Sequence, residues 1–215
     1  MGLDIYFRKF KKNDEISLDV KDGWDDIYNE CERQSREKFA KVYDNVLSSL
    51  KKADNYEEAY KKGIKKICKF SNYPQFDYGK LGVSYDYSTH QYNYTTTPIE
   101  VFERERNDII SKHYAPYIAY FRKANFVYAY FQGKLIDEIA WVTRGDLIDL
   151  IDRCKKVLED HTLAEKLLPT RSGFFFGSTE YDDWYYNDVK DCKKQMEKLL
   201  KGFKDDELMY VSMSW

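Results

Sequence analysis

The segment Leu3–Phe10, with the sequence LDIYFRKF, decides the fold of this chain because apolar and polar side chains alternate along it. This period of two places Leu3, Ile5 and Phe7 on one side of an extended chain, which predicts a half-buried β-strand. The C-terminal segment Leu208–Trp215, LMYVSMSW, alternates in the same way. Apolar terminal segments need a partner to hold them in place, so we expect the two to pair in one small, mostly antiparallel sheet.

The remainder of the chain is mostly helical in pattern, which predicts an α+β fold with helices packed on that sheet. We expect a single domain of 215 residues in which residues 22–97 are an insertion of two helices and a tyrosine-rich β-hairpin. The two helices are expected at Asp22–Asp54 and Tyr56–Phe70, where apolar residues recur at helical spacing. Further helices are expected to start at a capping Thr143 and to cover Tyr181–Phe203.

The β-hairpin is predicted by two alternating segments, Val83–Tyr87 and Tyr92–Thr95, on either side of the turn residues Ser88–Gln91. Its tyrosines are expected to project in cross-strand pairs. Either they pack on a core face, or they form an exposed recognition surface; the residues are Tyr85, Tyr87, Tyr92 and Tyr94.

The segment Tyr117–Phe131, YIAYFRKANFVYAYF, predicts one largely buried helix in which only Arg122, Lys123 and Asn125 are strongly polar. An unpaired charge that is removed from water costs several kcal/mol, so these cations need an anionic partner. A carboxylate of the protein or a phosphate of a ligand would serve. The Arg122 guanidinium offers forked donors to either group, and the Asn125 amide could bind a base edge or a ribose.

A second candidate site is the segment Pro169–Tyr186, PTRSGFFFGSTEYDDWYY, which precedes the last predicted helix. Backbone amides at a helix start can hold an anion, although the acidic residues Asp182 and Asp183 would repel a phosphate there. The segment is either a structural crossing or a binding loop. Its candidate ligand-binding residues are Arg171, Ser172, Phe174, Phe175, Phe176, Ser178 and Tyr181.

Composition and charge narrow the classes of function. The net charge of −2 argues against duplex nucleic acid and membrane surfaces as partners. We find no secretory hydrophobic region and no bilayer-spanning segment, so a cytoplasmic location is expected. The four cysteines lack the close pairs of zinc or redox motifs and predict buried free thiols; they are Cys31, Cys68, Cys154 and Cys192. We therefore predict no metal, no cofactor and no catalytic residue.

Four pieces of the chain resemble an uncharacterised family of phage and prophage proteins. MGLDIYF at the N-terminus, YFRKAN at 120–125, SGFFFGSTEYDDWYY at 172–186 and the final SMSW are similar to that family's MGLDMYL, YWRKAN, SGFFFGSTxYDxYY and Ser-Trp end. The resemblance covers the first ten residues and most of the chain after Tyr114, and Phe121 stands where the family has tryptophan. It supplies no reaction, but it implies a viral protein in a bacterial host cytoplasm.

The phage resemblance and the residue chemistry together predict a small-molecule binding protein that sequesters a nucleotide-like host defence signal. A phosphate would meet Arg122, Lys123 and Arg171, and a base would stack on Phe174–Phe176 or Tyr181. Two alternatives stay open. One is an enzyme that degrades or modifies such a signal, with Asp182 or His161 as general base. The other is a protein-binding module whose tyrosine-rich hairpin binds a host protein. The surplus of tyrosines also allows a homo-oligomer.

Overall fold

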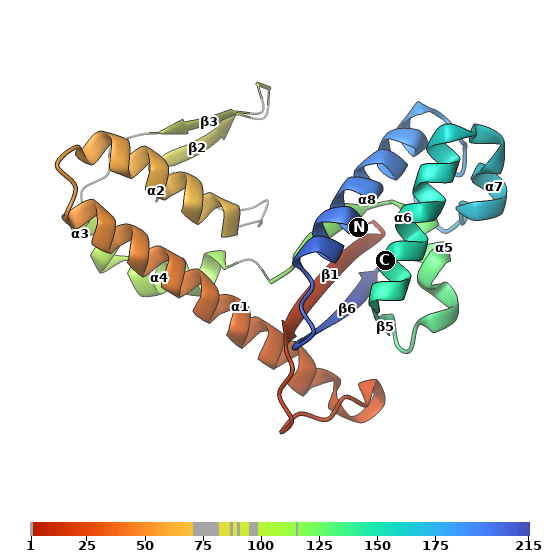
Figure 1. Ribbon diagram of the computed structural model, residues 1–215, viewed down its shortest axis with the longest axis horizontal. Coiled ribbons are helices and arrows are strands. Elements are labelled where there is room, and N and C mark those ends of the chain that lie inside the picture. The colour runs from red at the N-terminus through yellow and green to blue at the C-terminus, as the bar shows by residue number, and fades with distance from the viewer. Residues whose placement is uncertain (1, 71–81, 87, 90, 95–98, 115) are drawn as a thin grey trace. The chain divides into compact units, whose positions relative to one another are not determined.

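The computed structural model describes residues 2–70, 82–86, 88–89, 91–94, 99–114 and 116–215. It divides the chain into two compact units (Figure 1). The first unit contains Met1–Cys31 and Tyr117–Trp215, and the second contains Glu32–Pro116. The long helix α1 (Val20–Lys51) runs from the first unit into the second.

The first unit is built on an antiparallel sheet that contains both terminal strands. The two lie side by side over their whole length, with Asp4 opposite Ser214 and Lys11 opposite Glu207. This confirms the predicted α+β fold and the pairing of the two ends. The order of the four strands is β4 (Ala119–Arg122), β1 (Asp4–Lys11), β6 (Glu207–Ser214) and β5 (Ile139–Trp141).

One face of this sheet carries the main hydrophobic core. Ile5 and Phe7 of β1 and Val211 of β6 are fully buried there against apolar side chains of the helices. The helices α6 and α8 lie along this side of the strands in Figure 1. The helical elements that contribute are α5 (Asn125–Phe131), α6 (Arg144–Glu159), η3 (His161–Leu163), α7 (Ala164–Leu167) and α8 (Asp183–Gly202), and the short η2 (Gln132–Lys134) follows α5 without adding a buried residue.

The opposite face of the sheet is covered at one end by the first turns of α1. Ile27 and Cys31 of this helix pack on Phe10, Tyr210 and Ile139. Because side chains alternate along a strand, the even-numbered residues of β1 and β6 point to this face. The sheet is therefore a layer between a large core and a smaller one.

The prediction of a single helix over residues 117–131 is wrong. Residues 119–122 instead form β4, which pairs with β1 so that Phe121 lies opposite Ile5. Lys123 adopts a positive φ of 60° and separates the strand from α5, which begins at Asn125. A residue with a side chain pays for this conformation sterically, by roughly 1–2 kcal/mol, so the pairing of β4 and the packing of α5 must outweigh that cost.

The second unit contains the helix that was predicted after the loop at 53–55 and most of the helix that was predicted before it. The second part of α1 packs on α2 (Tyr56–Phe70) with α3 (Ile99–Arg104) and α4 (Arg106–His113). The helices approach closely at Gly63, where a Cβ atom would lie 2.5 Å from Val46 Cγ1. The Tyr43 hydroxyl is buried and donates to the backbone oxygen of Phe102 at 2.8 Å.

The predicted β-hairpin also belongs to the second unit. Its strands are β2 (Val83–Asp86) and β3 (Gln91–Tyr94), and their register places Tyr85 opposite Tyr92. This confirms the predicted cross-strand pairing of these two residues. The choice between a core face and a recognition surface depends on tyrosine side chains that lie outside the described part of the structure, as does Tyr87. No helix within the described residues has the length and apolar character that a membrane span requires.

Candidate functional site

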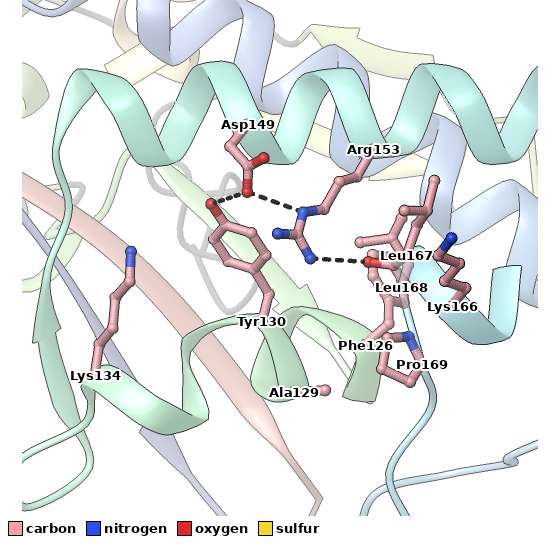
Figure 2. Close-up of a pocket in the computed structure, with 10 residues that line it drawn as sticks. All are labelled: Phe126, Ala129, Tyr130, Lys134, Asp149, Arg153, Lys166, Leu167, Leu168 and Pro169. Carbon is pink, nitrogen blue, oxygen red and sulfur yellow. Dashed lines mark hydrogen bonds and ion pairs between the residues drawn. The ribbon is translucent and has the colours of Figure 1, made fainter. Parts of the chain in front are cut away.

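A cavity of about 250 Å³ lies in the first unit between α5, α6 and α7 (Figure 2). One part of its lining is apolar and comes from Phe126 and Ala129 of α5 and from the end of α7. The other part is polar and contains three cationic side chains and one carboxylate. The apolar residues are Phe126, Ala129, Leu167, Leu168 and Pro169, and the polar ones are Tyr130, Lys134, Asp149, Arg153 and Lys166.

Helix α6 places a carboxylate and a guanidinium side by side in this lining. Its start is fixed by a capping box in which Thr143 and Asp146 bind each other's backbone amides. Asp149 and Arg153 follow on one face, one helical turn apart, and Arg153 Nε donates to Asp149 Oδ2 at 2.9 Å. The Arg153 guanidinium also donates to the Leu167 backbone oxygen at 3.3 Å, which ties α6 to α7.

Tyr130 of α5 joins the same network (Figure 2). Its hydroxyl donates to Asp149 Oδ2 at 2.9 Å and lies 3.1 Å from the backbone oxygen of Asp146. Burial, together with the hydrogen bond to Asp149 and its negative charge, raises the pKa of the Tyr130 hydroxyl well above its ordinary value. The Arg153 guanidinium carbon lies 5.2 Å from the centre of the Tyr130 ring, within the range of a cation–π contact. Tyr130 therefore stays a neutral donor at physiological pH.

The two lysines of the lining differ in their partners. Lys134 forms an ion pair with Asp146, which is not one of the lining residues. Lys166 is exposed at its mouth and makes no ion pair or hydrogen bond with any residue that the structure describes. The cations around the cavity thus exceed the carboxylates that hold them by the charge of Lys166. An anionic group entering the cavity would find one ammonium group and the remaining N–H donors of Arg153 available.

The residues predicted from sequence lie elsewhere in the first unit, and none of them lines the cavity. Asn125 is 3% exposed and uses its amide to hold the loop before α8. Its Nδ2 donates to the backbone oxygens of Phe176 at 3.3 Å and Ser178 at 2.8 Å, and its Oδ1 accepts from the Arg171 backbone amide at 3.4 Å. The Asn125 side chain is therefore satisfied by the protein and acts as an anchor.

The expectation that Arg122 and Lys123 are buried is also wrong. Both side chains are exposed, because Arg122 ends an outer strand and Lys123 lies in the turn after it. They nevertheless lie near the anchored loop, since a Cβ atom on Gly177 would be 3.1 Å from Lys123 Cβ. The structure thus brings the end of β4 and the loop 169–182 together.

The aromatic residues of this loop divide by burial. Phe176 packs in the core and contacts Tyr128 and Trp215, with ring centres 4.8 and 5.6 Å apart. Phe174 is 94% exposed, and Phe175 is partly exposed and accepts a hydrogen bond from the Leu3 amide through its backbone oxygen. The loop is completed by Arg171, Ser172 and Ser178, which are exposed, and by Tyr181, which is partly buried and whose hydroxyl accepts from the Thr170 amide.

The two residues considered as general bases have structural contacts away from the cavity. Asp182 caps α8 by accepting a hydrogen bond from the Tyr185 amide at 3.0 Å. The His161 ring stacks on the Tyr186 ring at a centre-to-centre distance of 3.7 Å. Within the described ranges, no group of three or more histidine, cysteine, aspartate or glutamate side chains is placed to hold a metal ion.

Sequence reasoning missed every residue of the cavity lining. The clearest signal for it is the pair Asp149 and Arg153 at a spacing of four on the predicted helix after Thr143. Such a pair is common on solvated helices, so it gave no reason to suspect a site. Comparisons of the chain with protein-family models, curated proteins and solved structures gave no match.

Proposed function

We propose that the protein binds a small anionic molecule in the cavity between α5, α6 and α7. The observation that supports this most is the combination of an apolar wall with a cationic mouth, in which Lys166 has no partner among the described residues. The anionic group of the ligand lies against Lys166 and the free donors of Arg153. The rest of the ligand packs on Phe126 and Ala129.

The size of the cavity limits the ligand. At about 250 Å³ it falls below the range of roughly 300–1,000 Å³ that is typical of pockets for drug-sized molecules. A sugar phosphate fits this description, as does the phosphate and ribose end of a nucleotide, whereas a dinucleotide does not. A nucleotide-like signal of the kind that the phage resemblance implies would therefore enter with its phosphate end only, and its base would remain outside.

The arrangement favours retention of the ligand over its turnover. Asp149 already accepts hydrogen bonds from Tyr130 and Arg153, and each of these donors has a second partner in the protein. A general base must reach the proton that it removes, and this carboxylate is oriented away from that task by both donors. Sequestration of a ligand accordingly has more support than its chemical modification.

Calorimetric titration with a series of small phosphates tests the proposal. Ribose 5-phosphate, AMP and inorganic phosphate are titrated into the full chain, and each mixture is analysed for products afterwards. We expect binding of ribose 5-phosphate without turnover. Lys166→Met should weaken this binding about 10-fold, the loss expected for one charge-assisted contact of roughly 1.4 kcal/mol.

A matched control separates the cavity from general charge. Lys190→Met removes an exposed cation from α8, outside the lining, and should leave the affinity unchanged. Equal affinity of the Lys166→Met variant and the parent, or an equal loss in both variants, would count against the proposed site. Conversion of the ligand to products would shift the balance to the enzymatic alternative.

A further inference from the structure

The first unit contains a buried cation that lacks an anionic partner, and it is Arg8 of β1. The residue is 9% exposed, and no described carboxylate lies within ion-pair distance of its guanidinium. One hydrogen bond holds it, from Nη1 to Ser212 Oγ at 2.5 Å, and Nε is buried without a partner. A guanidinium has five N–H donors, so most of its donor capacity is unused.

Aromatic rings surround this guanidinium. Its central carbon lies 4.9 Å from the ring centre of Tyr6, 5.7 Å from that of Tyr28 and 6.0 Å from that of Tyr210. Cation–π contacts offset part of the free-energy cost of burying the charge, but a ring offers no acceptor in the plane of the N–H groups. The Tyr210 hydroxyl, on the residue directly opposite Arg8 in the sheet, is also buried without a partner. Arg8 Nε and the Tyr210 hydroxyl are therefore two buried donor groups without hydrogen-bond partners on the same face of the sheet.

The surface that continues from Arg8 is suited to a flat ring. Along the same face, Tyr6 is paired with Ser212 on β6 and with Tyr120 on β4. The Tyr6 and Tyr120 rings are 5.1 Å apart, and the Tyr120 hydroxyl donates to Asp4 at 2.5 Å. This hydrogen bond fixes the orientation of the Tyr120 ring.

A second guanidinium ends the surface on its far side. Arg122 lies opposite Asp4 on the same face as Tyr120, and its side chain is exposed. Arg8 and Asp4 are four positions apart on β1, and Arg122 lies opposite Asp4. At about 3.4 Å per residue, the row from Arg8 to Arg122 is roughly 14 Å long, which is comparable to the length of one nucleotide. The face thus offers a buried cation at one end, aromatic rings in the middle and an exposed cation at the other end.

We propose that this face of the sheet, on the side opposite the α6–α8 layer, binds a nucleoside monophosphate. The phosphate accepts hydrogen bonds from unused N–H groups of Arg8 and from the Ser212 hydroxyl, which itself accepts from Arg8 Nη1, and the base stacks on the ring of Tyr120. Arg122 faces the far edge of the base. The site shares no residue with the cavity between α5, α6 and α7, so the two proposals stand or fall separately.

Backbone amide NMR with AMP as the probe locates the binding. We expect AMP to shift the amide signals of β1, β4 and β6 around Tyr6, Arg8 and Ser212. Adenosine and inorganic phosphate each carry half of the contacts and should bind on the order of 10- to 100-fold more weakly. Shifts confined to the cavity lining, or none at all, overturn the proposal.

Three variants test the assignment of the cation. Arg8→Met should weaken AMP binding at this face at least 10-fold, and without AMP it should unfold at the same temperature as the parent or higher, because it removes a buried unpaired charge. Arg122→Gln, at an exposed position that tolerates substitution, should weaken binding about 5-fold. Lys12→Gln removes an exposed cation beyond the end of β1 and should have no effect. An unchanged AMP affinity in the Arg8→Met and Arg122→Gln variants overturns the proposal.

Discussion

Replacing Asn125 tests whether one buried amide holds the loop 169–182 to the rest of the first unit. The side chain makes three hydrogen bonds to loop backbone groups, at 2.8, 3.3 and 3.4 Å. A typical intramolecular hydrogen bond contributes about 0.5–1.5 kcal/mol net, and the two longer ones belong at the low end of that range. Asn125→Ala should therefore lower the free energy of unfolding by about 2–3 kcal/mol.

Asn125→Asp should lower the free energy of unfolding further than Asn125→Ala does. The new carboxylate has no donor to offer and would face the backbone oxygens of Phe176 and Ser178, which now accept from the amide. A matched control is Asn187→Ala, which removes an exposed asparagine from α8. Its expected effect is within about 0.5 kcal/mol of zero.

Tryptophan fluorescence measures these changes in the first unit alone, because all four tryptophans of the chain belong to it. For a unit of this size, 2–3 kcal/mol corresponds to a fall in the melting temperature of about 5–10 °C. Hydrogen exchange supplies the local readout. The Leu3 amide donates to the Phe175 backbone oxygen at 3.1 Å, so its protection should fall in Asn125→Ala. A variant Asn125→Asp as stable as the parent would refute the reasoning.

Three further predictions follow from burial and charge. Phe176→Ala should cost about 3–5 kcal/mol because the ring is in the core, whereas Phe174→Ala should cost under about 0.5 kcal/mol, as urea unfolding would show. Burial raises the pKa of Asp146, but the Lys134 ammonium and the hydrogen bonds from Thr143 lower it more, so the net pKa is below the ordinary value. The stability difference between the parent and Asp146→Asn should accordingly be complete above about pH 5 and shrink as the pH falls through the depressed pKa; a difference that grows on acidification would contradict this. All four cysteines are buried, and burial raises the pKa of Cys68 to about 11, so a thiol reagent at pH 8 should modify the native chain only as fast as it unfolds.

The parts of the fold that the sequence predicts are those with one clear periodicity. The terminal strands alternate over eight residues each, and the pairing of β1 with β6 confirms the reading of that pattern. The same holds for α2, whose bounds at Tyr56 and Phe70 were predicted. By contrast, β5 is only three residues long, too short for a period of two to be recognised.

The segment 117–131 shows why the remainder was not predicted. Its tyrosines and phenylalanines serve equally well in a strand and in a helix, so the alternation of β4 was hidden among other aromatic residues. The strand and the helix are separated at Lys123, which has a positive φ, and a lysine in the sequence does not predict that conformation. The argument that a buried cation needs an anionic partner was made for Arg122 and Lys123, which are exposed, whereas Arg8 is buried by rings from the start of α1 and from β6.

The cavity could not be predicted for a similar reason. Tyr130, Asp149 and Lys166 come from three different helices, and only their packing brings them to one lining. Taken alone, none of these residue types is unusual for the segment of sequence in which it occurs. A tyrosine in an apolar stretch predicts core packing, and a lysine in a short helix predicts a solvated surface.

The central claim is that an anion binds at the mouth of the cavity, and an NMR titration of the full chain with ribose 5-phosphate tests it most directly. The account predicts saturable shifts of the backbone amides at Phe126–Lys134, Asp149–Arg153 and Lys166–Pro169, and their loss in Lys166→Met. Saturable shifts that bypass these segments, or shifts that persist unchanged in Lys166→Met, would contradict it.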